Sequence, residues 1–407
     1  MPANQVHVCH PNDAADPDAM DRYVDIAQES LLGTNLEMWQ LYLDRIDRVN
    51  GRVVQSENRL VGGLAFYRTG HLFGGREVSA AGVSGVAIDP AHRGANACAK
   101  LLESTLQELQ REGMPIASLY ASTQHLYRGV GFEQAGSRFE YSIPLRCMPR
   151  PDRSLECTRF VEPPMDALDA VHRQRALANN GNLVRTEGLW DRLLRPYDHR
   201  RCVTYLFGDL NSPAGFAILK QSDRQDGLPA QLEATDWAAN SPAALRRLMA
   251  LLHDHRSMMD RFRWFGGPQD PLLMVSSEQW VQVHDVLRWM IRILNVPSAF
   301  EARGYPKGLE GRILIDIQDD LLKSNAGAWC MEWSDGHCRV VRPQESPPSD
   351  SPVAVRADIR SLAPLFSGFA TAAQLQQLGM LDCQDSEPVA LLDAAFAGTS
   401  PWLSEIF

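Results

Sequence analysis

The stretch from Gly85 to Gly113, GVAIDPAHRGANACAKLLESTLQELQREG, joins an apolar segment to an amphipathic one through a short loop of arginine and small residues. We expect a helix beginning at Ala95, because apolar side chains follow at the i, i+3, i+4 spacing of a helix with one buried face. That face is predicted to hold Cys98, Leu101, Leu102, Thr105, Leu106 and Leu109. The first turn of such a helix presents backbone N–H groups with partial positive charge.

Phosphate oxygens bind at helix ends of this kind, and small residues at Gly94, Ala95 and Ala97 would let them approach closely. Arg93 adds a forked cationic donor. The loop has no Gly-Lys-Ser/Thr and no dinucleotide fingerprint. The junction therefore suits a pyrophosphate of unspecified kind, and a tight strand-to-helix connection is the alternative interpretation.

The elements around this junction form a first domain of about 145 residues by its length and turn signals. A strand is predicted at VHVCHP, and helices at MDRYVDIAQESLL and LEMWQLYLDRI. Two apolar runs flank SEN in GRVVQSENRLVGGLAFYRTG, which indicates a hairpin. After the junction come a strand IASLYAS, a short helix at HLYRGV, and strands up to Pro144.

A second region repeats this order faintly. YLFGDLNSPAGFAILKQ has the hairpin shape, and a helix follows with Ser241 as N-cap and Pro242 at its first position. ATDWAAN before that helix lacks the arginine and the small-residue loop, so we predict that the second region binds no cofactor. A third region begins near RILNVPSAFEARGYP and contains strands such as GRILIDIQ, AWCMEW and CRVVRP, followed by two helical stretches.

Composition excludes several classes of function. The 407 residues carry 40 Lys+Arg against 50 Asp+Glu, and a net charge of -10 argues against nucleic-acid binding but not against a cationic small substrate. The sequence contains neither an apolar run long enough for a membrane span nor a signal peptide, so we expect a cytoplasmic protein. Its eight cysteines have no C-x-x-C pair, and Cys330, His337 and Cys338 lack a second ligand pair, so we expect no metal.

Two motifs resemble those of the GCN5-related N-acetyltransferases. Val86-Ala87-Ile88-Asp89-Pro90 followed by Arg93-x-x-Asn96-x-Cys98 resembles their acetyl-CoA motif, Arg/Gln-x-x-Gly-x-Gly/Ala. LYRGVGF, residues 126–132, resembles their tyrosine-containing helix and Gly-Phe strand. The resemblance extends to the three-domain Eis (enhanced intracellular survival) family through PQDPLL, RILNVPSAFEARGYP and LLDAAFAGTSPW, and so covers nearly the whole chain.

This resemblance implies an α+β fold of mixed α/β domains in three parts. They are a catalytic acetyltransferase domain over residues 1–148, a degenerate second copy over 149–292, and a domain similar to sterol carrier proteins (SCP2-like) over 293–407. It also implies a homo-oligomer, a hexamer. One departure is Asn96 in place of the motif glycine. If this position needs a positive φ, asparagine replaces glycine at a cost of roughly 1 kcal/mol or less.

Transfer of an acetyl group to an amine needs a neutral amine, stabilisation of an oxyanion and a proton for the leaving thiolate. The resemblance assigns the backbone N–H groups of Val86 and Ile88 to the acetyl and pantetheine arm. It assigns the pyrophosphate of acetyl-CoA to residues 93–97, namely Arg93, Gly94, Ala95, Asn96 and Ala97. Tyr127 would be the general acid, and a core aromatic is its alternative reading. Ser122 would touch the cofactor or cap the helix that follows.

The general base implied by the resemblance is the terminal α-carboxylate, here on Phe407. Such a group ionises near pH 3.3 to 3.7 in model peptides and is negative at pH 7. A frayed chain end is the competing reading, and Glu405 is the alternative base. Trp39 aligns with an aromatic of the family's amine pocket, and aromatic faces attract ammonium groups. Other aromatic and acidic positions of that pocket appear as Gly85 and Ile406, so Glu405 would supply the acid.

The predicted function is therefore acetyl transfer to a small cationic amine, polyamine, lysine-like or aminoglycoside-like. The alternative is a lipid-binding or scaffold protein that uses the SCP2-like domain beside a vestigial transferase. The presence of both Arg93 and Tyr127 disfavours this alternative.

Overall fold

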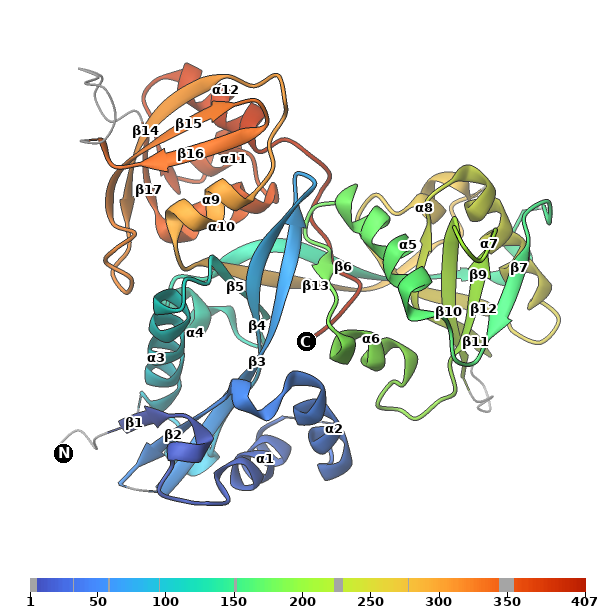
Figure 1. The fold of residues 1–407 in the computed structure, drawn as a ribbon, viewed down its shortest axis with the longest axis horizontal. Helices are drawn as coiled ribbons and strands as arrows, with labels where there is room; N and C mark the ends of the chain where they lie inside the picture. The colour runs from blue at the N-terminus through green and yellow to red at the C-terminus, as the bar shows by residue number, and fades with distance from the viewer. Residues whose placement is uncertain are drawn as a thin grey trace. The chain divides into compact units, whose positions relative to one another are not determined.

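The structure, a computed structural model, describes residues 6–31, 33–57, 59–94, 96–149, 152–222, 230–276, 278–343 and 355–407. They divide into two compact units (Figure 1). The first unit contains residues 1–135, 289–398 and 407, and the second contains residues 136–288 and 399–406. Each unit therefore combines segments that lie far apart in the sequence.

The first unit begins with a sheet flanked by helices. Its elements are β1 (Val6–Cys9), α1 (Ala19–Ser30), α2 (Leu36–Ile46), β2 (Gly51–Ser56), β3 (Arg59–Phe73), β4 (Arg76–Ile88), α3 (Ala97–Arg111), β5 (Ile116–Tyr120) and α4 (Gln124–Gly129). Strands β1 to β4 are antiparallel neighbours, and α3 crosses over to place β5 parallel to β4. The predicted hairpin is confirmed as β2–β3, with its register running from Gly51–Ala65 to Ser56–Arg59.

The strand next to β5 in this sheet comes from much later in the chain. Residues Trp289–Ile293, the end of β13 (Gln282–Ile293), pair antiparallel with β5. Inside β13 the buried Arg292 forms a two-pronged ion pair with Asp319, at 2.7 and 2.9 Å. Strand β5 therefore has a neighbour that the local sequence pattern does not indicate.

The same unit carries a separate five-stranded sheet in the order β16-β15-β14-β17-β18. Its elements are α9 (Val296–Ala302), β14 (Gly311–Gln318), β15 (Gly327–Ser334), β16 (His337–Val341), β17 (Val355–Asp358), α10 (Ile359–Ser367), α11 (Ala372–Gln377), β18 (Leu381–Asp382) and α12 (Ser386–Ala395). The three predicted strands of this region are confirmed as β14, β15 and β16. The two helical stretches expected after them are three helices, because Gly368 ends α10 in the left-handed conformation and a capping box at Thr371 starts α11 anew.

The second unit repeats the first arrangement. Its elements are β6 (Glu133–Pro144), β7 (Cys157–Phe160), α5 (Met165–Leu177), β8 (Leu183–Val184), α6 (Glu187–Leu194), β9 (Val203–Phe207), β10 (Gly215–Gln221), β11 (Gln231–Ala239), α7 (Pro242–Asp254), β12 (Arg261–Gly266) and α8 (Pro271–Val275). Helix α7 crosses over to place β12 parallel to β11, and β6 pairs antiparallel with β12.

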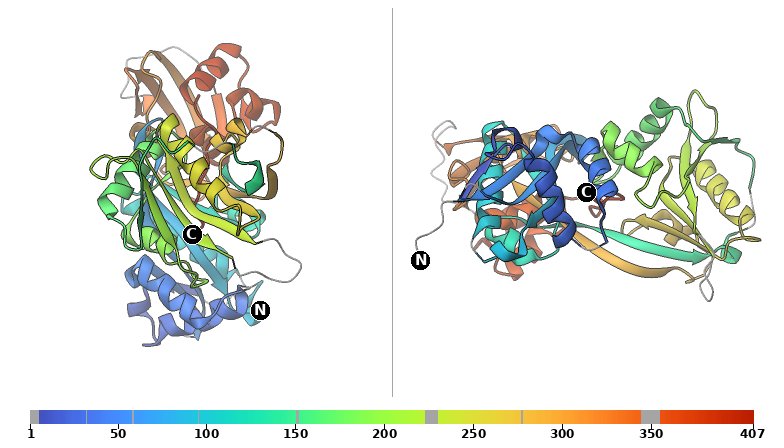
Figure 2. Two further views of the ribbon diagram at one scale, coloured as in Figure 1. Left: turned by 90° about the vertical axis from the view of Figure 1, so that its right-hand side faces the viewer. Right: turned by 90° about the horizontal axis from the view of Figure 1, so that it is seen from below.

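Helices cover both faces of the second unit's sheet (Figures 1 and 2), and the side chains of β10 point alternately toward the two layers. Ala217 and Leu219 pack with Leu248 of α7 on one face. Phe216 and Ile218 pack with α5 and α6 on the other face, since successive side chains of a strand point to opposite sides. The second unit is thus a sheet between two helical layers. The predicted N-cap of α7 is confirmed, since the Ser241 hydroxyl accepts the Ala244 N–H at 3.1 Å.

Candidate active site

A bulge in β4 lies beside the junction that the sequence singled out. The register between β3 and β4 shifts, so that Gly85 and Val86 together oppose the single residue Leu64. Gly85 has φ +63°, a value that glycine adopts without strain. A bulge leaves its extra residue outside the ladder. The backbone around Val86 is therefore released from regular pairing, which resumes at Ala87 opposite Gly63.

The junction itself is an exposed turn that leads into α3. A 3-10 turn covers Pro90–His92, and Asp89 caps it by accepting the Ala91 N–H at 2.8 Å. That hydrogen bond, together with His92, keeps the pKa of Asp89 below its usual value. Arg93, Gly94 and Asn96 are exposed, and Ala95 lies outside the described residues. Gly94 has φ +82°, with no atom within 4 Å of the position that a Cβ would take.

Asn96 occupies the left-handed region, with φ +63° and ψ +8°. The sequence predicted that asparagine would be tolerated here if the position needs a positive φ, and the structure meets that condition. Its side chain makes no capping hydrogen bond to α3. The amide groups of the first turn of α3 are consequently not capped by Asn96.

The expected start of the helix at Ala95 is wrong, because α3 begins at Ala97. A left-handed residue cannot continue a right-handed helix, so Asn96 sets the boundary. The predicted buried face is largely confirmed by Leu101, Leu102, Thr105, Leu106 and Leu109, and Ala97 joins it. Cys98 is only half-buried, because it lies at the open end of this face.

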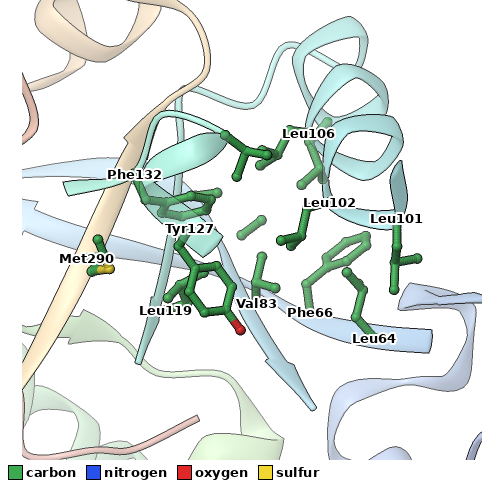
Figure 3. Packing of buried hydrophobic residues seen from close by; sticks show 14 of the residues in the cluster. Leu64, Phe66, Val83, Leu101, Leu102, Leu106, Leu119, Tyr127, Phe132 and Met290 are labelled. Atoms are coloured by element: carbon green, nitrogen blue, oxygen red, sulfur yellow. The ribbon is translucent and has the colours of Figure 1, made fainter. Parts of the chain in front are cut away.

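Tyr127 of α4 packs on the core that α3 covers. Its ring meets Phe132 edge to face at 6.1 Å, and the side chain is 6% exposed. Figure 3 shows the phenol oxygen pointing away from Phe132. Burial raises the pKa of the phenol well above its usual value of 10, and the neighbouring Cys98 adds to the shift. Tyr127 is both a core aromatic and a phenol that stays protonated at neutral pH.

Trp39 of α2 is nearly fully buried and lies against the bulge. A Cβ on Gly85 would come within 3.2 Å of its ring and would collide with the Tyr23 hydroxyl, which donates to the Gly85 carbonyl at 2.6 Å. Tyr23 and Trp39 meet edge to face at 5.9 Å. Within the described residues the Trp39 indole N–H has no hydrogen-bond partner. Glycine at position 85 thus makes room for these two rings.

A series of aromatic rings continues from Trp39 to the last residue of the chain. Trp39 contacts Tyr42 at 5.0 Å, Tyr42 contacts Tyr67 at 6.3 Å, and Tyr67 contacts Phe407 at 6.5 Å between ring centroids. Tyr120 at the end of β5 contacts the Phe407 ring at 5.8 Å.

Phe407 is 6% exposed, and its ring lies over Gly82 of β4, where a Cβ would be 3.1 Å away. The reading of a frayed terminus is therefore wrong for this side chain. The absence of a side chain at Gly82 leaves the space that the Phe407 ring occupies.

Ser122 is exposed between β5 and α4. The N-cap of α4 is Thr123, so the reading of Ser122 as a helix cap is wrong.

Glu405 lies in the second unit, within a cluster of buried charges. Its Oε1 accepts from the Arg185 Nε at 2.5 Å, and Arg185 also binds Asp236 at 2.6 Å. Burial raises the pKa of Glu405, but the Arg185 charge outweighs burial and holds the pKa below its usual value. The carboxylate that the sequence proposed for substrate binding is therefore already ion-paired. Residues 185 and 405 are too far apart in sequence for any local pattern to indicate this pair.

The tail before Phe407 is bound to the second unit along most of its length. The Thr399 hydroxyl and carbonyl oxygen both accept from Asn180, each at 3.0 Å. The Trp402 carbonyl accepts from Asn182 at 2.9 Å, and the Ser404 carbonyl accepts from Arg138 at 2.8 Å. This tail is a fixed part of the fold.

The second unit has the same bulge without an open helix end after it. The β10–β11 register shifts beside Ile218, so that Thr235 is the extra residue of β11. The side chain of Asp236, the next residue, accepts hydrogen bonds from Arg175 and Arg185. Ser241 caps α7, whereas no side chain of Asn96 caps α3. The two copies therefore differ at this junction in the side chains around the bulge and at the helix end.

Among the described residues, no helix has the length and apolar character needed to cross a membrane, and no group of His, Cys, Asp and Glu could hold a metal ion. All eight cysteines are free thiols.

Sequence profiles of known families match three stretches of the chain. A profile described as an acetyltransferase (GNAT) domain matches residues 13–135, a second GNAT profile matches residues 181–293, and a sterol carrier protein domain matches residues 296–404. The curated N-acetyltransferase Eis of Mycobacterium tuberculosis is 29% identical over 346 residues, which is 79% of each chain.

Among solved structures, a GCN5-related N-acetyltransferase from Anabaena variabilis is 31% identical, with a TM-score of 0.92 over 99% of this chain and 100% of that one. Eis1 from Mycobacterium abscessus, at 21% identity and a TM-score of 0.80 over 99% and 100% of the two chains, has the same fold. These likenesses define the class as GCN5-related acyltransferases with a sterol-carrier-like domain. Within that class the chain belongs to the Eis family of N-acetyltransferases and is an acyltransferase. The predicted fold class is confirmed.

Proposed function

We propose that the protein transfers the acetyl group of acetyl-CoA to an amine of a small cationic substrate: a polyamine, a lysine-like amine or an aminoglycoside-like amine. The observation that carries this proposal is the β4 bulge at Gly85 followed by the left-handed Asn96, which opens the first turn of α3 without a side-chain cap. Bound acetyl-CoA supplies the acetyl group as a thioester.

We assign the cofactor-binding residues as the sequence predicted them. Arg93 and the amides of the junction would hold the pyrophosphate, because a helix N-terminus with an exposed arginine binds anions. The backbone at Val86 and Ile88 would hold the pantetheine arm and polarise the acetyl carbonyl. Ser122 is retained as a cofactor contact, since it is exposed beside Tyr127's helix and is not its cap.

The proposed general acid is Tyr127. A phenol whose pKa is raised by burial holds its proton at neutral pH and can donate it to a leaving thiolate. The proposed general base is the Phe407 α-carboxylate, which would accept the proton that the amine loses as its nitrogen bonds to the acetyl carbon. The ion pair with Arg185 makes Glu405 the poorer base, since a carboxylate with a lowered pKa accepts a proton less readily.

Trp39 is proposed to face the substrate amine, because its ring lies beside the bulge and aromatic faces attract cations. Membership of an acyltransferase family disfavours the alternative of a lipid-binding scaffold with a vestigial transferase. We further propose residues 1–148, 149–292 and 293–407 as the sequence domains, a hexameric assembly by family resemblance, and a cytoplasmic location, which suits eight free thiols.

The test is Tyr127→Phe, which keeps the ring packing and removes the proton donor. We expect turnover in a thiol-release assay to fall about a hundredfold to ten-thousandfold, with acetyl-CoA affinity by calorimetry nearly unchanged. Tyr305→Phe is the matched control, because Tyr305 is an equally buried phenol, bonded to the Phe300 carbonyl, outside the proposed site. Unchanged turnover in Tyr127→Phe, with chemistry limiting, would assign Tyr127 to the core alone.

Calorimetry on the full chain also tests which copy binds the cofactor. We expect one acetyl-CoA per chain, lost in Arg93→Ala, because Ser241 and the Asp236 ion pairs close the equivalent junction of the second unit. A second site of comparable affinity would contradict this expectation.

A further inference from the structure

A cavity of about 340 Å³ lies within the second unit, and none of its lining residues is assigned to acetyl transfer. Its wall combines the end of α5, the end of β11, the loop from Gly267 to Pro271 and the tail residues Thr399, Ser400 and Trp402. This volume is within the usual range for small-molecule sites, which are mostly apolar with a few placed polar groups. Trp237 and Trp402 supply much of the apolar wall.

Asp270 is the unusual residue of this wall. Its side chain is buried, with 4% of the residue exposed, and one oxygen accepts the Leu272 N–H at 2.9 Å. The other oxygen packs against Gly266, where any Cβ would collide with it. In the part of the chain that the structure describes, no ion pair reaches this carboxyl. Burial raises its pKa to about 7, although the Leu272 hydrogen bond, the Trp264 side chain and the Arg175 charge oppose the shift.

The other charged residue of the wall, Arg175, is already ion-paired. Arg175 donates to both oxygens of Asp236, at 2.8 and 3.1 Å, and also to the Trp237 carbonyl. Arg185, behind it, binds Asp236 and Glu405, so the cluster has equal numbers of positive and negative groups. Asp270 is consequently the ionisable group of the described wall that forms no ion pair, and the Arg175 charge that acts on it is already paired with Asp236.

The asparagine side chains of the wall already form hydrogen bonds within the protein. Asn179 accepts from the Trp402 indole N–H at 3.1 Å, and Asn240 donates to the Val171 carbonyl at 2.9 Å. These bonds hold the wall in place. Asp270, the tryptophan rings and the buried Arg175 Nε, which has no hydrogen-bond partner among the described residues, remain for a ligand.

We propose that this cavity binds a small organic amine in its cationic form, with the ammonium group at Asp270 and the hydrocarbon part against Trp237. A buried carboxylate without a partner is costly, and a ligand cation would supply the missing charge. The tryptophan face adds attraction for the same cation. An anionic ligand would meet a like charge at Asp270 and no uncompensated arginine. This is a binding site and not a second transferase site, because the second unit has a capped helix where the first has an open one.

The test uses the full chain and two probes of equal size, 4-bromobenzylamine and 4-bromobenzoate. Crystals soaked in each probe are compared by bromine anomalous scattering, and binding is measured by calorimetry. We expect a bromine peak in this cavity with the amine, a dissociation constant measurable in solution, and no peak with the benzoate. The anomalous map separates this site from any amine bound at Trp39, so the proposal and the proposed function can fail independently.

Two variants make the result specific. Asp270→Asn keeps an oxygen for the Leu272 N–H and should weaken the amine at this site tenfold or more, since a charged hydrogen bond is lost. Ala178→Leu, on the cavity wall and remote from Asp270, should block the site by filling it. Acetyl transfer should be unchanged in both variants. The proposal is overturned by an absent amine peak in the wild type, by an amine peak without measurable affinity in solution, by equal affinity in Asp270→Asn, or by preferential binding of the benzoate.

Discussion

Extending the chain by a single alanine after Phe407 would be the smallest change that removes the proposed base. The α-carboxylate at residue 407 becomes a neutral amide carbonyl, which takes no proton at neutral pH, while every side chain remains. The new terminal carboxylate lies one residue further on, by roughly 3.3 to 3.6 Å if extended. We expect turnover to fall about a hundredfold to ten-thousandfold, the usual worth of general acid–base catalysis. Acetyl-CoA affinity should persist, because Arg93 and Asn96 lie at the other end of the site and are untouched.

Deleting Phe407 is a second test of the same proposal, in which the terminal carboxylate moves back by one residue. It re-creates a carboxylate on Ile406, but short by roughly 3.3 to 3.6 Å, which exceeds the whole length of a hydrogen bond. It also removes a ring that is 6% exposed and packs on Tyr67 and Tyr120. Loss of a buried phenylalanine ring costs roughly 3–5 kcal/mol in a core, so the truncated tail should also dock poorly.

Phe407→Leu is the matched control, since it keeps the carboxylate and part of the apolar contact, and it should be the least impaired of the three. The assay is thiol release from acetyl-CoA with a polyamine, and mass spectrometry confirms the added alanine. An N-terminal tag should leave the rate unchanged. Full activity of the extended chain would refute the terminal carboxylate as the base and make Glu405 the next residue to test, through Glu405→Gln.

Three further predictions concern the fold around both sites. Asn96→Ala should lower the melting temperature, because a left-handed alanine costs roughly 1–2 kcal/mol more than glycine, whereas Asn96→Gly should not. Gly85→Ala should destabilise the first unit and impair turnover by displacing the Tyr23 hydroxyl, and Tyr23→Phe should partly restore stability when added to it. For Asp270, the folded protein binds the proton more tightly than the unfolded chain, so stability should fall as pH rises from about 4 to 7 and level off above that. Asp270→Asn should flatten this pH profile of unfolding, with Arg175 and Tyr141 as the other titratable groups nearby.

Local chemistry in the sequence was enough to predict much of the proposed site. The apolar spacing from Leu101 to Leu109 indicated α3 and its buried face, and Ser241 with Pro242 marked the start of α7. The positive φ at Asn96 could be anticipated, because the position resembles a motif glycine. The start of α3 was placed two residues early, since alanine at 95 and 97 favours helix and gives no stop signal of its own.

Features that depend on distant parts of the chain were not predictable in this way. The ion pair between Arg185 and Glu405 joins residues 220 positions apart, and no periodicity connects them. The bulge at Gly85 had a signal, an isolated glycine within an apolar strand, which also marks close approach of another group. The pairing of Trp289–Ile293 with β5 had none, because any apolar strand would satisfy the same pattern.

That last pairing bears on how the chain is made. Strand β5 ends at Tyr120, and its partner begins at Trp289, so at 5–20 residues per second the ribosome needs roughly 10–35 s to synthesise the roughly 170 residues between them. During that interval β5 has a free edge, which is the kind of surface that pairs with other nascent chains. We expect the first unit to gain protease resistance only after residue 293 has left the ribosome, and chains arrested before that point to depend on chaperones. Pairing β5 with such a late strand delays folding of the acetyltransferase sheet until both GNAT-like regions have been translated.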